Sequence, residues 1–178
     1  MRRSELEALG IQLPVLPTAV LGALPGPPEW AARLASIGVD VLASGAPEDT
    51  PDTWRAAAEA APYRAVMANP GDPAALAAAG AKLLQGDLPA QPGTYVLGPG
   101  DAMVAIVDGS SAEVEDPNVI GRLVVEAVQD TPPAQLWVVA TPGLHLLAED
   151  VVEAKLRALC EATYQARLAI AKIQFEMD

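Results

Sequence analysis

The chain has 178 residues, of which 51% are hydrophobic, enough for one domain with a sizeable core. Its 23 acidic and 11 basic side chains give a formal net charge of -12, which repels nucleic-acid phosphates and anionic membrane surfaces. We therefore expect neither a nucleic acid nor a membrane as its partner.

The cysteine content and the start of the chain indicate a cytoplasmic protein. The single cysteine, Cys160, excludes an internal disulfide and a zinc cluster with several cysteines. Two arginines precede an apolar stretch, but Glu5, Glu7 and three prolines interrupt it, unlike the continuous apolar core of a signal peptide. No apolar run approaches the roughly 20 residues that span a bilayer.

Strand-like and helix-like segments alternate through the first half of the chain. Predicted helices begin where a cap residue precedes a proline, as at Thr50 and Asp72, and end at a glycine, as at Gly38 and Gly80. Short apolar runs bounded by glycine and proline predict strands before and between these helices, within 15–22, 39–45, 63–70 and 81–87.

The second half is predicted to continue the pattern less regularly. Residues 94–111 hold two apolar runs separated by a Gly-Pro-Gly turn, which predicts two short strands. A helix begins at Asp116 and Pro117, a last strand follows at 135–141, and a long helix extends from Glu149 to about Lys172. Strands separated by helices form parallel sheets, so we expect one α/β domain over 1–178, either a barrel or an open doubly wound parallel sheet.

Three segments resemble one known family. "LPTAVLGALPGP" (16–27), "GVDVLASGAPED" (38–49) and the segment that begins "LWVVATPGLH" (136–145) are similar to strand motifs of the cobalamin-independent methionine synthases. That family is related to uroporphyrinogen decarboxylase and transfers a methyl group to a thiol bound by zinc. The resemblance implies a TIM-type barrel, shortened or incomplete, because six or seven strands are predicted where a closed barrel has eight.

The zinc-binding residues of that family are not matched. Pro142 stands at the position of the terminal cysteine, and the His-x-Cys pair is missing because His145 and Cys160 are the only residues of their kinds. Ala23 and Ala46 replace a serine and a substrate-binding glutamate. We therefore expect neither a metal nor a cofactor.

One family position is matched by a carboxylate. "AIVDGSS" (105–111) resembles a family strand that ends in Asp-Glu, which makes Asp108 the candidate catalytic residue that binds a substrate amine. Gly109 replaces the glutamate that follows in the family. The equal alternative is that Asp108 caps the turn after it through its own side chain.

The other candidate ligand-binding residues lie near predicted strand ends, and each also has a purely structural interpretation. The loop carboxylates Glu48 and Asp101 are as readily solvated, Asn69 starts an Asn-Pro turn, and a lone His145 is more typical of a surface position. Cys160 is expected to pack as a core thiol rather than act as a nucleophile. The complete set of candidates is Gly22, Ser44, Gly45, Glu48, Asn69, Asp101, Asp108 and His145.

Two function hypotheses follow. The leading one is a diverged methionine-synthase-like barrel that has lost the zinc-thiol site and binds a small molecule or serves as an accessory or oligomeric protein. The alternative is a methyltransferase acting on a thiol such as homocysteine, with the metal or the methyl donor supplied by a partner. An incomplete barrel exposes strand edges, so we also expect a homodimer.

Overall fold

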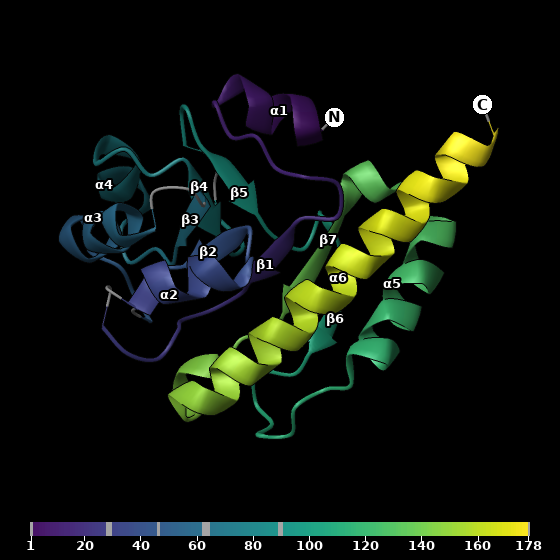
Figure 1. Ribbon diagram of the computed structural model, residues 1–178. Coiled ribbons are helices and arrows are strands. Elements are labelled where there is room, and N and C mark those ends of the chain that lie inside the picture. Colours follow the sequence, from purple (N-terminus) through teal and green to yellow (C-terminus); the bar gives the residue numbers. More distant parts are fainter. Residues whose placement is uncertain (1, 28–29, 46, 62–64, 89–90, 178) are drawn as a thin grey trace.

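The computed structural model describes residues 2–27, 30–45, 47–61, 65–88 and 91–177 (Figure 1). These residues form one sheet of seven strands: β1 (Thr18–Val20), β2 (Val41–Ala43), β3 (Ala65–Ala68), β4 (Leu83–Gln85), β5 (Tyr95–Leu97), β6 (Ala102–Val107) and β7 (Leu136–Ala140). The helices are α1 (Arg2–Ala8), α2 (Trp30–Ile37), α3 (Pro51–Ala60), α4 (Pro73–Ala78), α5 (Pro117–Asp130) and α6 (Glu149–Met177). Two short 3-10 helices, η1 (Pro133–Gln135) and η2 (Leu144–Leu146), flank β7.

The strand order identifies the sheet as a half-barrel. The order is β5-β4-β3-β2-β1-β7-β6, and every pair of neighbours is parallel. Apart from the step from β5 to β6, each connection advances in the same direction, so right-handed crossovers place their helices on one face. A doubly wound sheet reverses direction and carries helices on both faces. The prediction of a shortened barrel is confirmed, and the doubly wound alternative is wrong.

The described residues of two connections form no crossover helix. Residues 98–101 alone join β5 to β6, and the described residues between β4 and β5 form no helix. In the sheet, β5 and β6 are the two outermost strands and do not pair with each other. The curled sheet is therefore open at the seam between these two strands.

Local sequence signals explain where the helices begin. The side chain of Thr50 accepts a hydrogen bond from the Thr53 amide at the start of α3, and Asp72 accepts from the first amides of α4. Asp116 caps α5 in the same way, and a proline follows each of these three caps. The predicted starts of these helices are confirmed. Helix α1 was not predicted, and its Leu6 is buried against the interior of the barrel.

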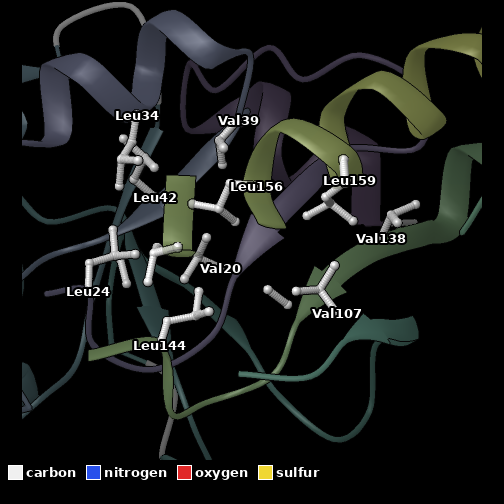
Figure 2. Close-up of a cluster of buried hydrophobic side chains, with 14 of the residues drawn as sticks. Val20, Leu24, Leu34, Val39, Leu42, Val107, Val138, Leu144, Leu156 and Leu159 are labelled. Atoms are coloured by element: carbon white, nitrogen blue, oxygen red, sulfur yellow. The ribbon is translucent and has the colours of Figure 1, made fainter. Parts of the chain in front are cut away.

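Both faces of the sheet are apolar and buried. Figure 2 shows the face toward the helices, where strand residues such as Val20, Leu42 and Val138 lie among Leu156 and Leu159 of α6. The opposite face fills the barrel interior, as the interior side chains of a TIM-type barrel do. Its buried members are Leu6, Ala19, Val41, Met67, Leu83, Leu97, Trp137 and Val139.

A charged network lies at the amino-terminal ends of β1 and β2. Arg167 of α6 donates to the carbonyls of Val15 and Leu16, both at 2.8 Å, and pairs with the buried carboxylate of Asp40. Asp40 also accepts hydrogen bonds from the amide and hydroxyl of Thr18, each at 2.9 Å. This network holds α6 to the base of the sheet.

Helix α6 is the longest element of the structure, with 29 residues. It lies diagonally across the helix-covered side of the molecule beside α5 (Figure 1). Charged side chains, among them Lys155 and Arg167, interrupt its apolar sequence. Within the described part of the chain, no helix combines the length and apolarity needed to cross a membrane.

Candidate functional site

A cavity of about 500 Å³ lies at the carboxyl ends of the strands. In parallel barrels this end of the sheet is where loops from successive strands meet and form binding sites. Every strand contributes to the wall, either through a residue at or just beyond its end or, for β6, through Met103. The lining residues are Leu21, Gly22, Pro47, Glu48, Asn69, Pro70, Gln85, Gly86, Leu97, Gly98, Pro99, Met103 and Pro142.

The cavity wall is mostly apolar. Leucine, methionine and four prolines form most of it, and the polar side chains are those of Glu48, Asn69 and Gln85. Glu48 is the one ionisable side chain among the described lining residues, which include no lysine, arginine or histidine. A mostly apolar pocket with a few polar groups is typical of a small-molecule site.

Gly22 and Gln85 fix the part of the wall between β1 and β4. The Gly22 amide donates to Oε1 of Gln85 at 3.1 Å. Gly22 has a φ of +78°, and a Cβ atom on it would lie 2.9 Å from Cβ of Pro142. Only glycine fits this position, because any side chain would be strained and would collide with Pro142.

A buried carboxylate, Asp49, joins the ends of β2 and β3 behind the cavity wall. Its Oδ2 accepts a hydrogen bond from the Asn69 amide at 2.6 Å and another from the hydroxyl of Ser44. The Asp49 amide in turn donates to the Asn69 carbonyl at 2.7 Å. Burial raises the pKa of Asp49, and its hydrogen bonds partly offset this increase. These bonds hold Glu48 and Asn69, the neighbouring wall residues, in place.

The structure brings three of the predicted residues, Gly22, Glu48 and Asn69, together at the cavity. Ser44 is fully buried and reaches the wall only through its hydrogen bond to Asp49. Gly45 lies outside the lining, and a Cβ atom on it would be 3.3 Å from the Gly26 carbonyl oxygen. Its position therefore serves close packing of two loops.

Asp108 does not line the cavity. Its Oδ1 accepts hydrogen bonds from the Ser110 amide at 2.8 Å and from the Ser110 hydroxyl at 2.7 Å. The hydrogen bond from this hydroxyl is the main reason that the pKa of Asp108 is lowered. The geometry is the local turn that the sequence offered as an alternative, and a role for Asp108 in binding or catalysis stays a prediction.

Asp101 and His145 also lie outside the cavity lining. The Asp101 carboxylate accepts from the hydroxyl of Tyr95 and from the Gly98 amide at 3.1 Å, so it fastens the turn between β5 and β6. His145 is exposed in η2. Ala46, which stands at the family's glutamate position, lies outside the described residues.

No metal centre is assembled in the described part of the chain, where no three His, Cys, Asp or Glu side chains are suitably grouped. His145 follows β7 at the cavity end of the sheet. Cys160 is half-buried beside Gly38, which precedes β2 and so lies at the opposite end. These two residues cannot act on the same ligand.

Two residues of the site were missing from the predicted set. Gln85 is the last residue of β4, and a polar side chain at the carboxyl end of an apolar strand is the signal that could have found it. Asp49, the residue after Glu48, was not among the candidates. Its burial depends on contacts with Ser44 and Asn69, which no local sequence pattern shows.

The comparisons with known proteins give a likeness only to solved structures, and it is weak. No protein-family model matches the chain, and no curated protein matches it. One similar solved structure is a B12-independent methionine synthase from Shewanella sp. W3-18-1 in complex with selenomethionine, with 13% sequence identity and a TM-score of 0.35. The match covers 84% of this chain and 53% of that one, so this chain spans about half the length of that protein. A likeness of this degree shows neither a family nor a ligand, and the resemblance to methionine synthases stays a prediction.

Proposed function

We propose that this protein binds a small molecule in the cavity at the carboxyl ends of its strands. The observation that carries the proposal is the cavity itself, about 500 Å³ in volume and walled by residues of β4, β5 and β6 and of the loops that follow the other four strands. Its size and mostly apolar wall fit those of small-molecule sites in general. The proposal makes the chain a ligand-binding barrel rather than a purely structural one.

The side chains at the cavity favour binding over catalysis. General acid-base chemistry requires a group that can exchange a proton within reach of the ligand, usually with a second group to orient it. Glu48 is the one such side chain among the described lining residues, and the Asp49 carboxylate is occupied by Ser44 and the Asn69 amide. We therefore place binding ahead of the methyltransferase alternative.

A relation of this protein to the methionine synthases is supported by the sequence resemblance alone. Pro142 stands where methionine synthases carry a metal-binding cysteine, and in this chain it forms part of the cavity wall against Gly22. This arrangement is consistent with a diverged barrel that retains the cavity at the carboxyl ends of its strands and has an apolar residue in place of a metal ligand.

The test is a thermal-shift and native mass spectrometry screen of small metabolites against the purified protein. A true cavity ligand should raise the melting temperature of the wild-type chain, because it binds the folded state alone. Met103→Trp, which fills the cavity, and Pro99→Trp, at its rim, should reduce or abolish that shift. Leu146→Trp, at a side chain that is 77% exposed and outside the lining, is the matched control and should bind as the wild type does.

Two results would contradict the proposal. Ligands that stabilise the Met103→Trp and Pro99→Trp variants as well as the wild type would bind elsewhere. Methyl transfer to homocysteine by the purified chain, with or without added zinc and methylfolate, would instead support the enzyme alternative.

A further inference from the structure

We infer that the ligand of the cavity is a small organic cation with an apolar body, and that Glu48 supplies the opposite charge. This inference rests on the proposed function and adds the chemical class of the ligand. Glu48 is the one charged residue among the described lining side chains, and it is an acid. Charge complementarity in a pocket with low-polarity walls decides which ligand charge is accepted.

No lysine or arginine lines the cavity among the described residues. Lys155 of α6 is fully buried and pairs with Glu115 at 2.8 Å, so it offers no charge to the cavity. Lys82 directly precedes β4, so it lies at the opposite, amino-terminal end of the sheet, where it donates to the carbonyl of Leu9. With a net charge of -12 on the whole chain, an anionic group in the cavity would meet repulsion without compensation. Phosphates and carboxylates are therefore disfavoured.

The uncharged part of the wall indicates that the uncharged part of the ligand is mostly apolar. Leu21, Leu97 and Met103 present apolar surface, as do the prolines that border the cavity. The Gly22 amide is a donor, so the Gln85 atom that faces it must be the oxygen, as the structure has it. The NH₂ group of Gln85 then has no hydrogen-bond partner among the described residues and can donate to one acceptor on the ligand.

The test compares three probes with the same apolar body and different charge: phenethylamine, phenethyl alcohol and phenylacetate. Their affinities are measured by ligand-observed NMR and calorimetry at neutral pH, where the amine is protonated and the acid ionised. We expect the amine to bind about two- to fivefold more tightly than the alcohol, the range of a solvent-accessible ion pair, and phenylacetate more weakly than both. The preference for the amine should decrease as salt is added.

The Glu48→Gln variant tests whether Glu48 causes the preference for the amine. It should bind the alcohol as the wild type does and lose the preference for the amine. Glu59→Gln, the same change at an exposed position of α3 outside the lining, should keep that preference. An amine preference that survives Glu48→Gln, or tighter binding of phenylacetate than of the amine, would overturn the inference.

The binding data distinguish a wrong ligand class from a cavity that binds no ligand. Equal binding of all three probes, abolished by Met103→Trp, would overturn the charge preference and leave the cavity a binding site. No binding of any probe at millimolar concentration, together with an empty metabolite screen, would overturn both.

Discussion

Lys155, a fully buried lysine of α6, is paired with Glu115 in the loop that joins β6 to α5. Its Nζ lies 2.8 and 3.0 Å from the two carboxylate oxygens and also donates to the carbonyl of Glu113. Glu115 in turn accepts a hydrogen bond from the Asp108 amide at 2.8 Å. One buried cation thus holds together the loop that follows β6, next to the open seam of the barrel.

Removing this cation should destabilise the fold. Lys155→Met leaves the Glu115 carboxylate and the Glu113 carbonyl without their buried donor, and we expect a loss of about 3 kcal/mol in the free energy of unfolding. Arg55→Met, which removes an exposed helical pair with Asp52, should cost less than about 1 kcal/mol. Urea denaturation measures both values. Equal losses of unfolding free energy in the two variants would show that the buried Lys155 pair stabilises the fold no more than an exposed pair does.

Asp49 should tolerate an amide better than an apolar side chain. Asp49→Ala leaves the Ser44 hydroxyl and the Asn69 amide without their acceptor, which should cost about 2–4 kcal/mol of unfolding free energy. Asp49→Asn keeps an oxygen acceptor and removes the buried charge, so we expect a clearly smaller loss. Chemical denaturation at neutral pH compares the two variants, and a ranking in the opposite order would contradict the assignment.

The raised pKa of Asp49 also predicts how the stability of the fold depends on pH. Burial raises its pKa in the folded protein above the ordinary value of 3.8, so the folded state holds the proton more tightly. Its contribution to stability is fully present below the unfolded-state pKa and is lost as the pH rises through the folded-state pKa. The wild type should therefore lose stability relative to Asp49→Asn as the pH rises above about 3.8. A difference in unfolding free energy that is constant with pH would contradict this.

Gly22 should not accept a side chain. Gly22→Ala forces a residue with a Cβ atom into a left-handed backbone conformation and against Pro142, and we expect a loss of about 2 kcal/mol or more. Gly121→Ala is the matched control, because nothing lies within 4 Å of the added Cβ atom in α5. It should stabilise the helix by about 0.5–1 kcal/mol. Thermal unfolding of both variants gives the comparison.

The open seam leads us to expect a homodimer. β6 is apolar and pairs with β7 on one side, and among the described strands its other edge has no partner. β7 is buried along its whole length, whereas β6 is half-exposed. Sedimentation velocity should give about twice the 18.4 kDa chain mass. Ala105→Glu on this strand should weaken association, and Ala169→Glu on the exposed side of α6 should not. A monomer at all concentrations would contradict the expectation.

Much of the fold was predictable because its signals are local. The caps at Thr50, Asp72 and Asp116 stand within three residues of the amides that they bind, and the apolar runs mark the strands. Helix α1 was not predicted, because its glutamates were considered only as an interruption of the apolar stretch near the start of the chain. What stabilises α1 is the burial of Leu6 against the barrel interior, a contact between distant parts of the chain.

The sequence by itself determined the order of strands and helices, their parallel arrangement and the strand ends where Gly22, Glu48 and Asn69 stand. The tertiary structure decided which of those ends meet. It joined Gly22 to Gln85 across 63 residues, buried Asp49 between Ser44 and Asn69, and left Asp108 on its own turn outside the cavity. The physical reason is that caps and periodicity act over a few residues. The cavity depends on strand pairing and on the direction in which the sheet curls, which are settled only when the whole core packs.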